Sequence, residues 1–172
     1  MADAVKRAGG VSFAQFVQSQ FDASVTWQDL ERYRAQWKGR LIVKGIMDAE
    51  DARQAVALGA DALVVSNHGG RQLDGAPSSI SMLPQIVDAV QGRAEVLLDS
   101  GVRSGMDILK ARALGAQAAL IGRAWLYGVG ALGETGVSMA LQIISRELQV
   151  SLALTGCNDV NALGPQHLVP RR

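Results

Sequence analysis

Three things are scarce in this 172-residue chain: cysteine, proline and unbalanced charge. Cys157 is the single cysteine, which excludes an intrachain disulfide and a cysteine-based metal site. A reducing, cytoplasmic setting is therefore the expected one. The formal net charge is +1 at pH 7, so nothing indicates binding to nucleic acid. Only four prolines are present, which leaves few rigid breaks between elements.

Long apolar runs are also missing. No uninterrupted stretch could span a bilayer, and residues 1–7 have no apolar signal core, so we expect neither a transmembrane segment nor a leader. Peripheral attachment to a membrane surface stays open. Apolar residues nevertheless make up 48% of the chain, which is enough for one domain with a real core, and 19 glycines predict many tight turns.

The chain divides into three predicted segments. Residues 1–39 form a helical lead-in, in which Ser12 caps a short helix and Thr26 with Asp29 caps a second that ends before Gly39. Residues 40–149 alternate between strands and helices. We expect strands at 41–46, 62–65, 95–99 and 118–122, with helices at 48–58, 81–91, 104–115 and 134–148. Residues 150–172 form a partly irregular tail.

An internal repeat supports a parallel sheet. Residues 55–63 resemble residues 111–119, and each copy is a helix end, a glycine and a strand entry. Strand–helix alternation at this spacing predicts an α/β fold of four parallel βα units. Four units are half of a TIM (β/α)8 barrel, which typically needs about 250 residues. An open, four-stranded Rossmann-like sheet is the alternative.

Every predicted strand ends in a polar or glycine-rich group. Lys44 closes the first strand, His68 follows the second, Asp99 closes the third and Arg123 follows the fourth. Each could alone be a solvated loop residue. The carboxyl ends of parallel strands share one edge or rim, however, so we expect the four groups to face one pocket.

The chemistry of these loops predicts a proton acceptor, a carboxylate clamp and a phosphate site. His68 could accept a proton while Arg71, three residues on, grips a substrate carboxylate. Glycine–arginine turns at 101–103 and 122–123 each precede a predicted helix or follow a strand. Backbone N–H groups beside an arginine bind phosphate, which indicates a phosphorylated cofactor. His167 fits a plain surface residue.

Four ordered motifs resemble the FMN-dependent α-hydroxy-acid dehydrogenase/oxidase family, which includes glycolate oxidase, L-lactate dehydrogenase and mandelate dehydrogenase. They are Ser66-Asn67-His68-Gly69-Gly70-Arg71-Gln72, Val43-Lys44-Gly45, Asp99-Ser100-Gly101-Val102-Arg103 and Ile121-Gly122-Arg123. The resemblance covers nearly the whole chain and implies the C-terminal half of a TIM barrel that binds FMN and oxidises an L-2-hydroxy acid to a 2-keto acid.

The resemblance also implies roles for single residues. His68 would be the catalytic base and Arg71 would pair with the substrate carboxylate. Lys44 would lie beside the flavin ring, and Ser66 would be a further flavin contact. The ribityl chain and phosphate would be held by a larger group: Asp99, Gly101, Arg103, Gly122 and Arg123. No residue is expected to bind a metal.

The resemblance implies a complete barrel in the family, and this chain resembles only the second half of it. The first half supplies substrate tyrosines, a second arginine and the aspartate that orients the histidine, and residues 1–39 hold no candidate for them. We therefore expect self-association or pairing with an N-terminal half-barrel. Two alternatives stay open: a non-catalytic FMN- or phosphate-binding half-barrel, and a different barrel enzyme such as a nucleotide dehydrogenase. The catalytic cysteine loop of the nucleotide enzymes is absent.

Overall fold

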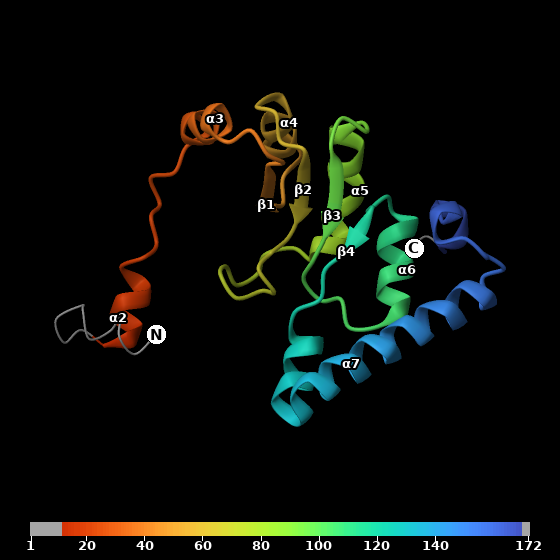
Figure 1. The fold of residues 1–172 in the computed structure, drawn as a ribbon. Coiled ribbons are helices and arrows are strands. Elements are labelled where there is room, and N and C mark those ends of the chain that lie inside the picture. The colour runs from red at the N-terminus through yellow and green to blue at the C-terminus, as the bar shows by residue number, and fades with distance from the viewer. Residues whose placement is uncertain (1–11, 170–172) are drawn as a thin grey trace.

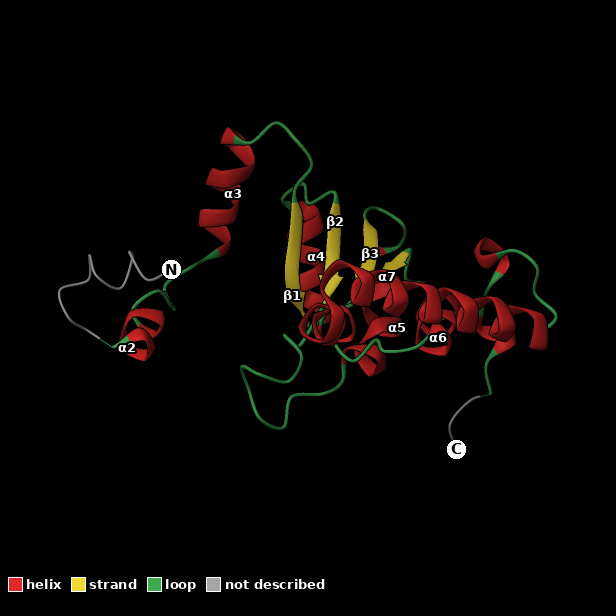
Figure 2. Cartoon of the chain, turned by 60° about the horizontal axis from the view of Figure 1, so that its bottom comes forward, coloured by secondary structure: helices red, strands yellow, loops and turns green. Residues whose placement is uncertain are grey.

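The computed structural model describes residues 12–169 (Figure 1). The chain opens with two short helices, α2 (Phe13–Gln18) and α3 (Trp27–Gln36). Both predicted N-caps are confirmed, because the Ser12 and Thr26 side chains accept hydrogen bonds from the backbone three residues on, each within a capping box. Figures 1 and 2 place α2 away from the sheet. α3 is tied to the sheet by the ion pair of Arg34 with Asp61, whose N···O distance is 3.3 Å.

The sheet has four parallel strands in the order in which they occur along the chain. They are β1 (Ile42–Ile46), β2 (Ala62–Val65), β3 (Glu95–Leu98) and β4 (Ala118–Ala119). Figure 2 shows them side by side. The predicted parallel sheet is confirmed, and sequential order with an intervening helix at each step is the arrangement of a barrel wall.

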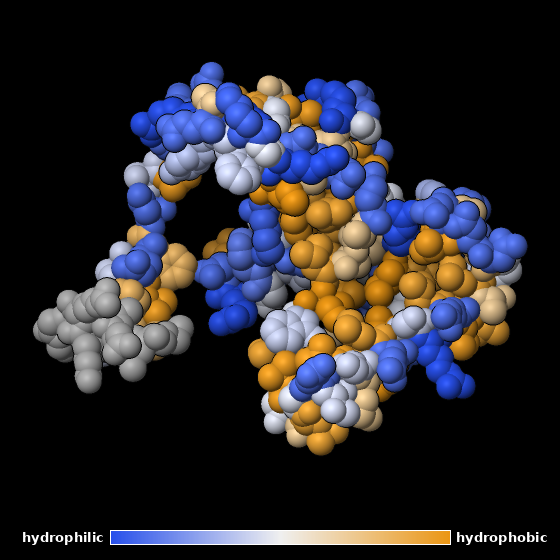
Figure 3. Space-filling view, viewed as in Figure 1, coloured by the Kyte–Doolittle hydropathy of each residue, from blue (hydrophilic) through white to orange (hydrophobic). Residues whose placement is uncertain are grey.

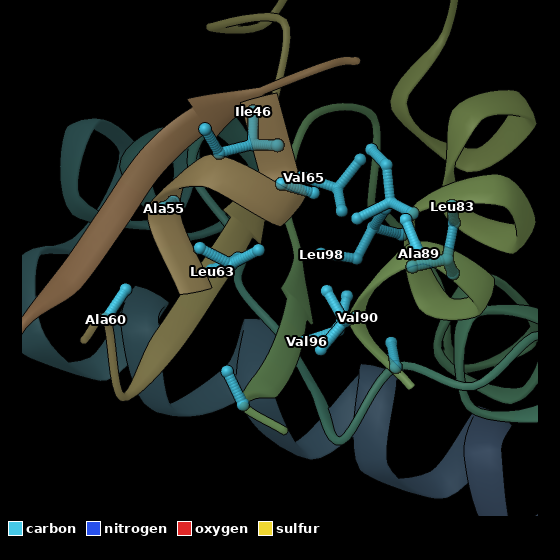
Figure 4. Packing of buried hydrophobic residues seen from close by; sticks show 14 of the residues in the cluster. Ile46, Ala55, Ala60, Leu63, Val65, Leu83, Ala89, Val90, Val96 and Leu98 are labelled. Carbon is cyan, nitrogen blue, oxygen red and sulfur yellow. The ribbon is translucent and has the colours of Figure 1, made fainter. Parts of the chain in front are cut away.

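Three helices connect the strands: α4 (Ala49–Ala57), α5 (Ser79–Val90) and α6 (Gly105–Ala113). Their apolar residues pack against one face of the sheet because alternate strand residues point to that face. The cluster joins strand residues to residues of α5: Leu63, Val65, Val96 and Leu98 with Leu83, Ile86 and Val90. Figure 4 shows this packing and labels all of them except Ile86. All seven are at most 2% exposed, so this cluster is the core that fixes the strand ends.

The last helix differs from the prediction. α7 runs from Arg123 to Leu154, whereas the sequence predicted a helix only over 134–148. It consists of two helices joined at a kink, where Leu132 and Gly133 leave helical geometry and Gly133 has φ +57°. A Cβ on Gly128 or Gly136 would collide with the backbone of the other glycine, so the two arms lie in direct backbone contact. Glycine has a low helix propensity, so propensity does not indicate a helix in the first arm, which is the part of α7 before the kink.

The fourth strand is shorter than the predicted 118–122. Regular pairing ends at Ala119, although the Leu120 N–H still donates to the Leu98 carbonyl at 2.8 Å. The chain then leaves the sheet toward the start of α7. Beyond α7 lie two short 3-10 turns, η1 (Val160–Ala162) and η2 (Pro165–His167).

Both sides of the sheet end in an open edge. Within residues 12–169, β1 pairs only with β2, and β4 pairs only with β3. Apolar side chains are left uncovered there, since Ile42 is 53% exposed and Leu120 is 40% exposed. Figure 3 shows apolar atoms across the middle of the face in view, between the polar upper region and α7. Among the described helices, none is both long enough and apolar enough to cross a membrane.

Candidate active site

A pocket of about 450 Å³ lies at the carboxyl ends of the strands. It brings together eight of the nine residues that the sequence singled out. The pocket lining includes Lys44, His68, Arg71, Asp99, Gly101, Arg103, Gly122 and Arg123. The ninth, Ser66, is only 1% exposed and lies behind the wall, in contact with Lys44. Residues spread over eighty positions therefore share one mouth, as expected for the rim of a parallel sheet.

A bulge in β1 aims Lys44 at this pocket. The pairing register with β2 shifts between Lys44 and Ile46, and Gly45 between them has φ +96°, a conformation that favours glycine. The Lys44 ammonium lies 3.1 Å from the Asp99 carboxylate and 3.1 Å from the Ser66 hydroxyl. It therefore bridges the ends of three neighbouring strands.

His68 stands on a loop with unusual backbone geometry. Its φ is +57°, and Gly69 and Gly70 follow at +74° and +71°. The His68 N–H donates to the Ser66 hydroxyl at 3.1 Å, which fixes the start of the loop. The imidazole lies against Gly45, where a Cβ would come within 2.9 Å of Cε1. The residue is exposed, so a ligand in the pocket can reach the ring.

Asp99 remains charged although it is partly buried. Burial by itself would raise the pKa of this carboxyl, but the Ser66 and Ser100 hydroxyls and the Lys44 ammonium together hold the pKa below its ordinary value. The Ser100 hydroxyl donates to Asp99 at 2.7 Å. The pocket thus holds a fixed negative charge beside the lysine, with acceptor capacity for ligand hydroxyls.

The two glycine–arginine turns differ in the structure. At the start of α6, the Arg103 and Ser104 N–H groups donate to the Asp107 carboxylate, and the Gly105 N–H donates to Glu147. These donors are occupied. At the start of α7, Gly122 is the N-cap and makes no side-chain cap bond, so the first-turn N–H groups are free of a cap. The start of α7 is therefore the better anion site, with the Arg103 and Arg123 side chains in the pocket lining.

Sequence reasoning missed some residues of the site. Ser100 was not singled out, yet its hydroxyl accepts the Gly69 N–H at 3.0 Å and donates to Asp99. Ser79, buried at the start of α5, donates to the carbonyls of Asp99 and Ser100. A serine between an aspartate and a glycine gave no signal of its own. Trp125, on the unpredicted first arm of α7, adds an apolar part to the pocket.

Comparison with known proteins gives a consistent result. Residues 2–170 match the family described as FMN-dependent dehydrogenase. The chain is 48% identical to an L-lactate dehydrogenase of Caulobacter vibrioides over 99% of its own length and 45% of the relative's. It is 50% identical to an L-lactate dehydrogenase of Stenotrophomonas maltophilia over 88% of its own length and 40% of the relative's.

Solved structures agree. A structure titled as the monotopic membrane protein (S)-mandelate dehydrogenase aligns with a TM-score of 0.87 and 46% identity, over 92% of this chain and 42% of that one. A mandelate oxidase mutant with a monooxide FMN adduct aligns with a TM-score of 0.79 and 49% identity, over 83% of this chain and 46% of that one. The chain spans a little under half the length of these relatives. It belongs to the FMN-dependent dehydrogenase family.

Proposed function

We propose that this chain carries the base, the carboxylate clamp and the cofactor-binding residues for the FMN-dependent oxidation of an L-2-hydroxy acid to a 2-keto acid. The observation that carries the proposal is the shared pocket. Its lining includes His68, Arg71, Lys44, Asp99 and Arg123. Family membership supports the same reaction, since the relatives are named as lactate and mandelate dehydrogenases or oxidases.

The pocket residues fit the chemistry of FMN. The volume of about 450 Å³ lies in the range of ordinary cofactor and ligand sites. An anionic phosphate suits the uncapped start of α7 with the side chains of Arg103 and Arg123. Ribityl hydroxyls suit the Asp99 carboxylate, and Trp125 and Leu126 offer apolar surface for a ring. Gly101 leaves open space where a Cβ would stand, which lets a ligand approach the backbone.

The residues would divide the reaction as follows. Oxidation of a 2-hydroxy acid releases two electrons and two protons, and bound FMN supplies the two-electron acceptor. Arg71 would bind the substrate carboxylate and orient the α-carbon. The neutral imidazole of His68 would accept one of the two protons, and the other would pass with the electron pair to the acceptor. Lys44 would place positive charge at the end of β1. This charge would stabilise the negative charge that the acceptor gains as it takes electrons from the substrate.

The test is direct. The purified chain is loaded with FMN, its visible spectrum is recorded, and L-lactate, glycolate and mandelate are added in separate anaerobic cuvettes. Bleaching of the bound flavin supports oxidation. His68→Gln should retain the flavin and lose the bleaching, whereas His167→Gln, which changes the other histidine of the chain, should bleach as the wild type does. Bleaching in His68→Gln at the wild-type rate would exclude His68 as the base.

A second candidate is a half-barrel that binds FMN or phosphate without turnover. The observation that favours it is length, because the chain spans less than half of each relative compared above. A yellow protein that no hydroxy acid bleaches would support this second function. A colourless protein after loading and desalting would contradict both.

We also propose that the open edges of β1 and β4 are covered by another half-barrel, either a second copy or an N-terminal counterpart. Unpaired strand edges and uncovered apolar residues such as Ile42 and Leu120 support this. Light scattering after gel filtration measures the association. A monomer that melts cooperatively without partner or flavin would contradict it.

For location, we propose the cytoplasm. Attachment to a membrane surface is the competing proposal, which the monotopic (S)-mandelate dehydrogenase favours by similarity. Co-sedimentation with anionic lipid vesicles separates the two.

A further inference from the structure

The loop that bears His68 is held by hydrogen bonds between Gly69, the residue after His68, and other segments of the chain. The Gly69 N–H donates to the Ser100 hydroxyl at 3.0 Å, and the Gly69 carbonyl accepts from the Arg123 guanidinium at 3.2 Å. Both backbone polar groups of one glycine are thus bound, one by the loop that follows β3 and the other by the first residue of α7. The His68 N–H is bound as well, by Ser66.

The hydroxyl groups in this cluster are joined by hydrogen bonds that lead to Asp99. Ser100 donates to the Asp99 carboxylate, which can only accept. Ser66 already accepts from the Lys44 ammonium and from the His68 N–H. Its own proton can reach the Asp99 carboxylate or the Ser100 oxygen, which lies 3.5 Å away. Both routes end on Asp99, whose charge polarises the hydroxyls and strengthens the bonds that they accept.

The surrounding contacts hold the backbone of Ser100 in an unfavourable conformation. Its φ is +71°, which is unfavourable for a residue with a Cβ, and such strain persists only where surrounding contacts determine it. Those contacts are present, because the buried Ser79 hydroxyl donates to the Asp99 and Ser100 carbonyls at 2.5 and 3.1 Å. A glycine would relieve the strain but would remove the hydroxyl.

We propose that Ser66 and Ser100 are positioning residues that fasten the backbone of His68 and Gly69 to the Asp99 carboxylate. The orientation of the imidazole then depends on the same carboxylate that would meet the cofactor. This inference rests on the proposed function for the role of His68, although the fastening itself exists without any ligand.

The experiment follows backbone amide exchange by NMR on the full chain without FMN. In the wild type, the Gly69 amide should be protected, and a contact should be seen between the His68 Cε1 proton and the Gly45 Cα protons. Ser100→Ala should speed Gly69 exchange by roughly 2- to 10-fold, the effect of one ordinary hydrogen bond, and should weaken the His68–Gly45 contact. Ser100→Gly should do the same.

The glycine variant separates the hydroxyl from backbone strain. If strain relief were the main effect, Ser100→Gly would slow exchange while Ser100→Ala would not. The matched control is Ser104→Ala, five residues from Asp99, which removes the N-cap hydroxyl of α6 but no contact to the His68 loop. It should leave Gly69 exchange and the His68–Gly45 contact unchanged.

Three results would overturn the proposal: an unprotected Gly69 amide in the wild type, opposite effects of the alanine and glycine variants, or equal acceleration in Ser104→Ala. The first of these results is measured on the wild type, so the proposal can be refuted even if the variants do not fold. The proposed function fails separately. A chain that never binds FMN but shows the expected exchange keeps the fastening and loses the reaction.

Discussion

Gly45 makes room for the imidazole of His68, and adding one methyl group tests that directly. In Gly45→Ala, the new Cβ would lie 2.9 Å from His68 Cε1. Carbon atoms prefer about 3.5–4.0 Å, so the ring must move by roughly 0.6–1.1 Å. The ring is exposed and can move cheaply, so the displacement should affect its position more than the stability of the fold.

That displacement is large for a catalytic group. Functional side chains are held to within about 0.5 Å, and an error of about 1 Å costs on the order of 100-fold in rate. We therefore expect Gly45→Ala to retain bound flavin and to reduce the rate of flavin bleaching by a hydroxy acid about 100-fold. Anaerobic stopped-flow absorbance measures the rate, and the chemical shift of His68 Cε1 reports the ring without turnover.

Backbone strain must be separated from this effect. Gly45 has φ +96°, so alanine there also costs about 1–3 kcal/mol of unfolding free energy. Gly59, after α4, has φ +86°, but a Cβ there would meet only the Arg34 side chain at an ordinary 3.4 Å. Gly59→Ala should lose similar stability in urea denaturation and leave bleaching and the His68 shift unchanged. Equal behaviour of the two variants in every His68 measurement would refute the reasoning.

Three further predictions concern the charges and the packing around the pocket. The lowered pKa of Asp99 adds stability that is complete above its ordinary pKa of 3.8 and is lost as pH falls through the folded-state pKa. Lys44→Met should therefore reduce the difference in urea stability between pH 6 and pH 3. Arg123→Ala should weaken FMN binding roughly 10- to 100-fold, the value of a hydrogen bond to a charged group, in fluorescence titration; unchanged affinity would remove Arg123 from the phosphate site. Gly105→Ala should lower thermal stability by about 1–3 kcal/mol or more, because its Cβ would collide with the α7 backbone at Leu148; calorimetry showing no loss would contradict that packing.

Sequence reasoning succeeded where one local pattern determines the structure. Buried strands are continuous apolar runs, so the strand at 62–65 and the polar groups after it could be located from the sequence. Parallel pairing then placed Lys44, His68 and Asp99 at one edge without further information. Sequence reasoning failed at the first arm of α7. The contact between Gly128 and Gly136 depends on the kink between them and leaves no periodic apolar signal.

The two glycine–arginine turns show why the site could be only half predicted. In sequence both are a glycine and an arginine at the end of a strand, so both predicted phosphate binding equally. The structure distinguishes them through Asp107, which accepts the Arg103 and Ser104 N–H groups, and through Glu147, which lies 42 positions from Gly105 and accepts its N–H. Asp107 is a local partner, whereas nothing near residue 105 reveals Glu147. A similar long-range pairing, between Ser100 and Gly69 across 31 positions, holds the loop of the proposed base. The kinds of side chain in the pocket follow from local sequence, whereas which backbone donors remain free for a ligand depends also on contacts between distant segments.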